Sequence, residues 1–296
     1  MSTRARVSAP AKVNLRLHVL GRRADGYHDL ETLFQAIDLS DEVVVELRES
    51  GGVELSICGD VSGLGPIADN LAFRAASRLA ERVGFGGGVA VELTKRIPVG
   101  AGLGGGSSDA AAVLRGLARL LDVADDDLRL RACAEELGSD VPFFLSGSVL
   151  ARGGGRGEIL DPIDALPAAA LVLVAPPVHV STAQAYAALA GSRAATAAPS
   201  VPVARAPRSW SDVAAGASND FEPVVMRMFP EIRRALDALT AHGPRFALMS
   251  GSGASVFAMF SSEEESRRVA AALSDELGWP CHVVHTLVTM PKPRIA

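Results

Sequence analysis

The chain has 296 residues, of which 48% are hydrophobic and 21% are charged, and its formal net charge is −5. This composition is typical of a globular protein with a sizeable core, and the length suits one large domain or two of medium size. The acidic balance disfavours a nucleic-acid-binding surface. A ligand that carries phosphates must therefore be held by individual cations and backbone N–H groups.

The sequence predicts neither a membrane span nor a secretion signal. Its longest apolar stretch, residues 168–178, is interrupted by two prolines and falls short of the roughly 18 residues that a bilayer span needs. The first 15 residues carry charges but lack an apolar segment of the kind found in signal peptides. Cys58, Cys133 and Cys281 show no paired spacing, which indicates reduced thiols and a cytoplasmic location.

The first half of the chain begins with strands and continues into helices. Alternating apolar residues predict a strand over 5–20, and two more over 42–48 and 53–59, joined as a hairpin by Gly51 and Gly52. Helices are then expected over 71–83, 109–122 and 126–137, a strand over 88–96, and short strands over 141–147 and 148–155.

In the second half of the chain, predicted strands alternate with predicted helices. Strands are expected over 171–177, 245–251, 254–260 and 281–288, with helices after Thr182, near 220–241 and over 263–278. This βαββαβ-like order predicts a ferredoxin-like unit, and the whole chain is predicted to be α+β. We expect one domain over 1–158 and another over 159–296. The Ala/Pro-rich segment 191–208 is interpreted as a surface loop.

The strongest local signal is a glycine-rich segment ahead of the predicted helix at 109–122. Residues 98–108 read Pro-Val-Gly-Ala-Gly-Leu-Gly-Gly-Gly-Ser-Ser. Glycines let a backbone approach a ligand closely, and the helix that follows directs free N–H groups and a positive dipole end at the same space. Together these features favour an anion site suited to a polyphosphate, to which Ser107 and Ser108 can add hydroxyl donors.

Three other interpretations of this segment compete. A P-loop is excluded because no lysine precedes the serines. A dinucleotide fingerprint is formally matched by Gly100, Gly102 and Gly105, although Pro98 separates these glycines from the preceding strand. A purely structural glycine loop also stays open.

Two more segments carry polar residues at unusual places. Lys12 and Asn14 lie two residues apart, on one face of the first strand, where a lysine is costly unless an anion partners it. A solvated edge is the ordinary alternative. Tyr27 and His28 follow a turn, and an aromatic ring beside an imidazole suits recognition of a nucleobase by stacking and hydrogen bonding. A surface turn with a packed tyrosine is the alternative there.

Taken together, these motifs resemble those of the GHMP kinase family. The glycine segment 98–108 is similar to the family's phosphate-binding motif, and Met249-Ser-Gly-Ser-Gly-Ala-Ser-Val-Phe257 is similar to its third motif. The opening residues 9–15 and 21–30 resemble family members whose acceptor is a methylerythritol linked to cytidine diphosphate. The likeness also covers 137–143 and 218–220, and it is weakest over 191–208.

The resemblance implies an ATP-dependent kinase of a small molecule, with Mg²⁺ expected as the counter-ion of ATP and the metal ligands left open. Phosphorylation of the acceptor's 2-hydroxyl would serve the non-mevalonate route to isoprenoid precursors. The nucleotide would lie on Asn70, Lys95, Pro98, Gly100, Gly102, Leu103, Gly104, Gly105, Gly106, Ser107 and Ser108. The acceptor would contact Asn14, Tyr27, His28 and Thr182.

The resemblance also assigns the catalytic pair. Asp140, which follows a predicted helix end, would accept the proton of the substrate hydroxyl, and Lys12 would keep Asp140 ionised and neutralise the transferring phosphoryl group. A turn that closes the helix is the structural alternative for Asp140, and an N-cap is the alternative for Thr182. Two rival functions remain: a GHMP kinase with a homoserine or mevalonate-type substrate, and a nucleotide-binding regulator without catalysis.

Overall fold

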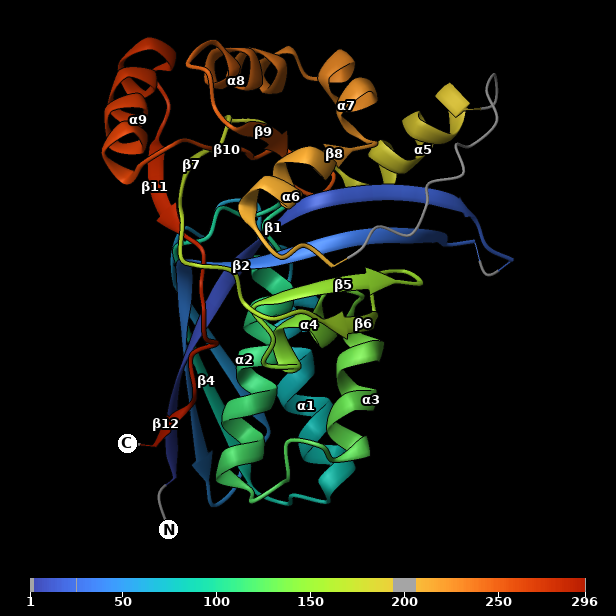
Figure 1. Ribbon diagram of the computed structural model, residues 1–296. Coiled ribbons are helices and arrows are strands. Elements are labelled where there is room, and N and C mark those ends of the chain that lie inside the picture. Colours follow the sequence, from blue (N-terminus) through green and yellow to red (C-terminus); the bar gives the residue numbers. More distant parts are fainter. Residues whose placement is uncertain (1–2, 25, 194–205, 296) are drawn as a thin grey trace.

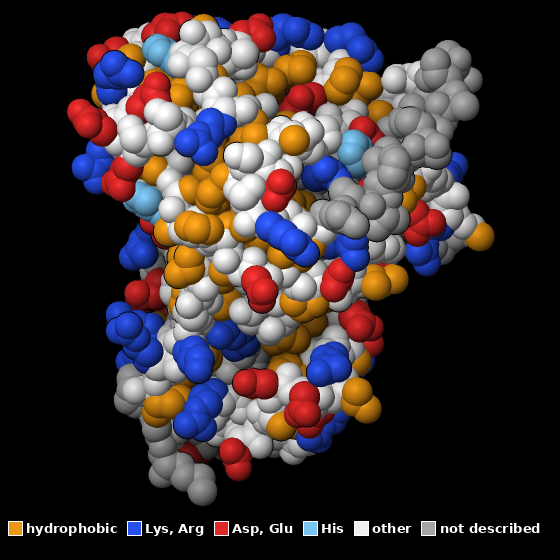
Figure 2. All heavy atoms as spheres, in the orientation of Figure 1, with side chains coloured by type: hydrophobic (Ala, Val, Ile, Leu, Met, Phe, Trp, Pro, Cys, Tyr) orange, Lys and Arg blue, Asp and Glu red, His pale blue; other side chains and the backbone are white. Residues whose placement is uncertain are grey.

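The computed structural model describes residues 3–24, 26–193 and 206–295. Two layered regions lie one above the other, and both termini lie beside the lower one (Figure 1). None of the helices in these ranges combines the length and apolar character of a bilayer span. On the face shown in Figure 2, acidic and basic side chains are interspersed over both regions. Most of the predicted loop at 191–208 falls outside the described residues.

The lower region is a mixed sheet covered on one face by helices (Figure 1). Its main strands follow the order β12-β1-β2-β4-β3, while β5 pairs with β2, β6 pairs with β5, and the short β8 pairs with β1. The strands are β1 Arg4–Arg22, β2 His28–Arg48, β3 Val53–Gly59, β4 Gly88–Lys95, β5 Leu150–Gly154, β6 Ile159–Pro162, β8 Ser218–Asn219 and β12 Arg294–Ile295. The helices are the 3-10 helix η1 Ile67–Asp69, α1 Leu71–Val83, α2 Gly105–Leu120, α3 Leu128–Leu137 and α4 Val141–Leu145.

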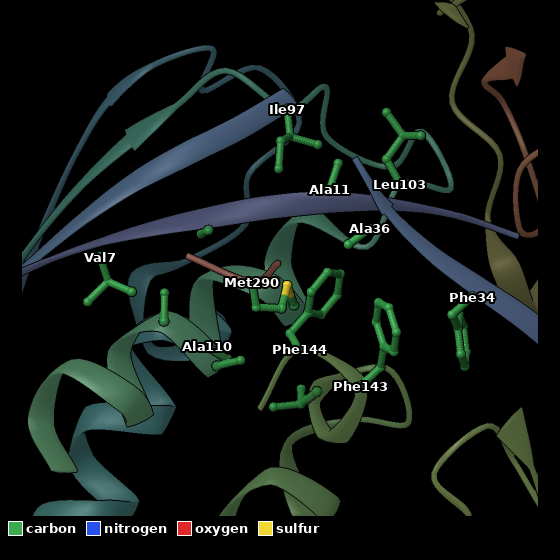
Figure 3. Packing of buried hydrophobic residues seen from close by; sticks show 14 of the residues in the cluster. Val7, Ala11, Phe34, Ala36, Ile97, Leu103, Ala110, Phe143, Phe144 and Met290 are labelled. Carbon is green, nitrogen blue, oxygen red and sulfur yellow. The ribbon is translucent and has the colours of Figure 1, made fainter. Parts of the chain in front are cut away.

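The core of this region forms because apolar side chains alternate along β1, as expected. Val7, Ala11 and Val13 are fully buried under α2, and Gly116 of α2 lets the helix approach, since a Cβ there would lie 3.2 Å from Val7. Phe34 and Phe143 stack with centroids 5.0 Å apart beneath the same strands (Figure 3). Each buried phenylalanine stabilises the fold by roughly 2–3 kcal/mol. This packing fixes the strand that carries Lys12.

The upper region has the predicted βαββαβ arrangement. Its antiparallel sheet has the order β11-β7-β10-β9, in which the first and last strands are neighbours at one side, as in a ferredoxin-like unit. The strands are β7 Ala170–Val174, β9 Phe246–Met249, β10 Val256–Met259 and β11 Cys281–His285. The helices are α5 Thr182–Arg193, α6 Trp210–Gly216, α7 Glu222–Met228, α8 Pro230–Ala241 and α9 Glu263–Leu277. The α+β class is confirmed, and the division between residues 158 and 159 stays a prediction.

The predicted hairpin between 42–48 and 53–59 is wrong. The strand at 42–48 is the end of the longer β2, and its neighbours are β1 and β4 rather than β3. β3 instead pairs parallel to β4 at the edge of the sheet, with α1 in the connection. The burial patterns give the reason: β4 is almost wholly buried and suits a central position, whereas β3 alternates between exposed and half-buried residues and suits an edge.

Three other boundaries differ from expectation. Residues 141–145 form α4 and not a strand, because Pro142 fits the first turn of a helix and both Phe143 and Phe144 are buried. The expected helix near 220–241 is divided into α7 and α8, with Pro230 beginning the second. The helix expected from 109 already begins at Gly105, so its N-terminus lies within the glycine segment.

Candidate active site

A cleft of about 1060 Å³ opens between the two regions. Its walls come from β1 and the start of β2, from the glycine segment, from the residues before α4, and from the upper region at 179–186 and 251–253. Since segments far apart in the sequence meet there, the cleft exists only in the folded chain. It is the natural place to look for the predicted site residues.

The glycine segment forms one wall of the cleft as predicted. Gly100, Gly102 and Gly104 all have left-handed φ values between 67° and 76°, and Gly104 is the N-cap of α2. Gly105 and Gly106 line the cleft in the first turn of α2, where helical N–H groups lack intrahelical partners. The helix N-terminus therefore faces the cleft and suits an anionic group.

Two of these glycines are also required by contact with the upper region. A Cβ at Gly100 would lie 2.2 Å from His179 Nδ1, and one at Gly102 would lie 2.1 Å from the backbone oxygen of Ser250. Ser250 Oγ donates a hydrogen bond of 3.0 Å to the carbonyl of Gly102. The glycines of this segment therefore allow the two regions to pack closely, and they also keep the phosphate cradle open.

Lys12 and Asp140 meet at the cleft. Lys12 Nζ lies 3.5 Å from Asp140 Oδ2, and it donates hydrogen bonds to Asn14 Oδ1 at 2.6 Å and to the carbonyl of Gly102 at 3.0 Å. The lysine side chain is buried, whereas that of Asp140 is 31% exposed. Asp140 precedes α4, and its side chain makes no capping hydrogen bond to that helix. The carboxylate is free to face a substrate in the cleft.

Aromatic side chains gather in another part of the cleft. His28 stacks on Tyr186 with centroids 4.8 Å apart, Phe221 supports Tyr186 edge-on at 4.9 Å, and the Arg156 guanidinium lies 4.9 Å from the Tyr27 ring. Burial, and next the charge of Asp140, raise the pKa of Tyr186 to about 12, so its phenol stays neutral. These rings provide flat surfaces close to Asp140.

Asn14 and Thr182 both line the cleft, and each forms a hydrogen bond with the hydroxyl group of another residue. Asn14 Nδ2 donates to Thr32 Oγ1 at 2.7 Å, which sets the side chain beside Lys12. Thr182 is the first residue of α5, and its hydroxyl lies 3.1 Å from Ser252 Oγ. This contact joins α5 to the glycine motif at 249–257.

Lys95 lies in a buried charge cluster beneath the glycine segment. Its ammonium bonds the carboxylates of Asp41 and Asp109, the latter at 2.7 Å, and Asp41 also accepts the N–H of Ile97 at 2.8 Å. Burial raises the pKa of Asp109 to about 8, and the charge of Asp41 adds to this, while Lys95 opposes it. Burial lowers the pKa of Lys95, but the charges of Asp109 and Asp41 outweigh it and leave that pKa raised.

The structure brings the predicted site residues together, with one exception. Those that line the cleft are Lys12, Asn14, Tyr27, His28, Asn70, Lys95, Pro98, Gly100, Gly102, Leu103, Gly104, Gly105, Gly106, Ser107, Asp140 and Thr182. Ser108 is buried and does not line the cleft, and its hydroxyl has no hydrogen-bond partner among the described residues. Sequence reasoning missed His179, Tyr186, Arg156 and Phe221, which also line the cleft.

Known proteins resemble this chain along most of its length. The family model described as "GHMP kinases N terminal domain" matches residues 70–148, and "GHMP kinases C terminal" matches 201–278. A curated 4-diphosphocytidyl-2-C-methyl-D-erythritol kinase of Citrifermentans bemidjiense is 42% identical over 94% of this chain and 98% of the relative. A crystal structure of 4-(cytidine 5'-diphospho)-2C-methyl-D-erythritol kinase superposes with a TM-score of 0.77 at 40% identity, covering 95% of this chain and 98% of that one. A homoserine kinase from Cytophaga hutchinsonii, with a TM-score of 0.74 but 23% identity over 100% and 98% of the chains, shares the fold.

Proposed function

This chain belongs to the GHMP kinase family, and from that premise we propose that it transfers the γ-phosphoryl group of ATP to the 2-hydroxyl of 4-diphosphocytidyl-2-C-methyl-D-erythritol. It is a small-molecule kinase, and its 42% identical relative carries the name of the kinase for this acceptor. The reaction would belong to the non-mevalonate route to isoprenoid precursors. Its free cysteines, Cys58, Cys133 and Cys281, support a further proposal that it works in the cytoplasm.

One arrangement carries the proposal: the Lys12–Asp140 pair lies beside both the phosphate cradle and the aromatic rings. Lys12 contacts the Gly102 carbonyl of the cradle, and the charge of Asp140 acts on Tyr186. A cleft with a phosphate cradle, an acid and base pair and an aromatic surface suits two nucleotide-like ligands that meet end to end. The triphosphate would lie along Gly102 to Ser107, with its terminal group toward Lys12.

The chemistry follows from this placement. Asp140 would accept the proton of the attacking hydroxyl, and the Lys12 ammonium would stabilise the charge on the phosphoryl oxygens as they transfer. Phosphoryl transfer requires positioning and charge stabilisation more than covalent chemistry, so a carboxylate is an adequate base. The N–H groups of Gly105 and Gly106 would hold oxygens of the nucleotide throughout.

Mg²⁺ is proposed to arrive with ATP. The described residues bring together no group of three or more His, Cys, Asp or Glu side chains that could hold a metal. This fits an ion bound chiefly by phosphate oxygens and water, which is the usual mode for Mg²⁺ in phosphoryl transfer. When bound, it would neutralise part of the charge of the triphosphate.

The aromatic surface would select the cytidine end of the acceptor. A cytosine ring placed against Tyr27 and Tyr186 would stack, and His28 can hydrogen-bond the edge of a base. Asn14 and Thr182, which hold positions beside Lys12 and Ser252, would contact the polyol. A homoserine or mevalonate-type acceptor would make no use of these rings.

The test is a comparison of acceptors under equal conditions. ADP release should depend on the acceptor and should be at least 100-fold faster in kcat/KM with the cytidine-diphosphate-linked polyol than with free methylerythritol phosphate, homoserine or mevalonate. Equal rates with unlinked polyols would reject the substrate but keep the kinase. Absence of acceptor-dependent ADP release would reject catalysis and leave a nucleotide-binding regulator.

A further inference from the structure

The segment Ser218–Glu222 connects the sheet of the lower region with the upper region. Its first two residues form β8, which pairs parallel with Arg16 and Leu17 of β1. The next residue, Asp220, accepts the N–H of Val19 at 2.8 Å and lies 3.1 Å from His18 Nδ1. The segment is therefore fixed to the strand that carries Lys12.

The same segment also holds the glycine motif at 249–257. Asn219, which is 5% exposed, donates from its amide to the carbonyls of Met249 and Gly251, both at 2.8 Å, and its Oδ1 accepts the N–H of Phe221 at 2.9 Å. Glu222 Oε1 accepts the N–H of Met249 at 2.8 Å. Two side chains thus bind the residues at both sides of Ser250.

That motif in turn contacts the reacting groups. Ser250 Oγ and Lys12 Nζ donate to the same carbonyl, that of Gly102, each at 3.0 Å. A Cβ at Gly251 would lie only 3.4 Å from Lys12 Nζ and 3.1 Å from the Gly102 oxygen. A shift of the Ser250–Gly253 turn would therefore move the carbonyl that fixes the lysine ammonium.

We propose that Asn219, assisted by Glu222, is a positioning residue for phosphoryl transfer: it holds the Ser250–Gly253 turn that sets the Lys12 ammonium against Asp140. Neither side chain needs to contact a ligand for this role. The inference rests on the kinase function proposed above and adds a determinant of rate to it. Because Lys12 acts on the transferring phosphoryl group, a disturbed turn should lower kcat more than it raises either KM.

The first experiment uses Asn219→Asp, which keeps the shape and an acceptor oxygen but loses the two donated hydrogen bonds. We expect kcat to fall roughly 10- to 100-fold, as misplacement of a catalytic group by about 1 Å does, with both KM values within about 3-fold of wild type. Ser218→Ala is the matched control, since it removes a hydroxyl contact with His18 one residue away and leaves the turn alone. Its kcat should equal that of the wild type.

A second pair of variants, both at Glu222, tests the same role if Asn219→Asp fails to fold. Glu222→Gln keeps an acceptor for the Met249 N–H, whereas Glu222→Met has similar bulk and leaves that N–H unpaired. Near-wild-type kcat in the Gln variant with a loss in the Met variant would support the positioning role. Folded Asn219→Asp and Glu222→Met proteins with lowered melting temperatures but unchanged kcat would overturn it and show a purely structural contact.

The two proposals can fail separately. The wild-type rate with the cytidine-linked acceptor tests the substrate, whereas the ratio of variant to wild type tests the positioning role with whichever acceptor is turned over. If no acceptor is turned over, a crystal structure of Asn219→Asp decides: a displaced turn with Lys12 moved from Asp140 supports the inference, and an unmoved Lys12 overturns it.

Discussion

Lys12 and Lys95 show how one sheet uses the same side chain for two purposes. Each stands on a strand beside the cleft and each pairs with aspartate. Lys12 has a single carboxylate at 3.5 Å, and that carboxylate is partly open to the cleft. Lys95 has two carboxylates, both buried, so the three groups together would carry an excess negative charge if all were ionised. The balanced, accessible pair suits catalysis, and the buried triad suits support of the glycine segment.

The sharpest contrast is expected in the reaction rate. Lys12→Ala and Asp140→Asn should each lower kcat by roughly 10²- to 10⁴-fold, because each removes charge stabilisation or proton transfer from the transition state. The affinity for a non-hydrolysable ATP analogue, measured by calorimetry, should stay within a few-fold of wild type. A kcat within tenfold of wild type in either variant would contradict the catalytic assignment.

Loss of Lys95 should act on stability instead. Lys95→Met would leave Asp41 and Asp109 buried without a cation, which should destabilise the fold by roughly 3–5 kcal/mol. Thermal unfolding followed by circular dichroism would measure this as a large fall in the melting temperature. The Lys12→Ala variant is the comparison, and an equal or larger fall in that variant would remove the distinction between the two lysines.

The Asp109 carboxyl group of the triad should make the stability of the fold depend on pH. The pKa of Asp109 is raised from 3.8 to about 8 by burial, so the folded state favours its protonated form and this group lowers stability progressively as pH rises from about 4 to about 8. Asp109→Asn should therefore be more stable than wild type at pH 8, on the order of 1–3 kcal/mol, with little advantage at pH 4. Urea unfolding at both pH values measures the difference.

Asp41→Asn is the matched control for that experiment. Asp41 accepts hydrogen bonds from backbone N–H groups as well as from the lysine, and the amide of an asparagine would satisfy these donors less well. The variant should be less stable than wild type at pH 8. Stabilisation by Asp41→Asn and not by Asp109→Asn would contradict the raised pKa of Asp109.

The smallest effect is expected at two neighbouring serines. Ser107 lines the cleft, whereas the buried Ser108 hydroxyl has no partner among the described residues. Ser108→Ala should change stability by no more than about 0.5 kcal/mol and leave the KM for ATP unaltered, while Ser107→Ala should raise that KM several-fold. A larger effect on KM at Ser108 would place its hydroxyl in the nucleotide site after all.

The sequence predicted those parts of the site that depend on local physics. A run of glycines before a helix gives an anion cradle wherever the chain then folds, and a lysine on an apolar strand face needs an anionic partner. The helix period alone does not separate the two serines, because the consecutive residues Gly105, Gly106 and Ser107 all line the cleft. The burial of Ser108 becomes visible only in the folded chain.

The residues that were missed depend on contacts across the fold. His179, Tyr186 and Phe221 become site residues only because the upper region packs on the glycine segment and on β1. No local pattern marks them, and Phe221 alone resembles any other core phenylalanine. The short helix at 141–145 was missed for a related reason, since burial of adjacent Phe143 and Phe144 decides against a strand only when their surroundings are known.

The contact between Gly102 and Ser250 bears on attempts to reuse the nucleotide cradle elsewhere. The conformation of the cradle depends on contacts with a part of the chain almost 150 positions later. The cradle is therefore not a self-contained local motif. Transplanting 98–108 with α2 into another sheet would carry over the flexible glycines but not the wall against which they are folded. A donor for such grafting would have to include the Ser250–Gly253 turn and the segment that braces it.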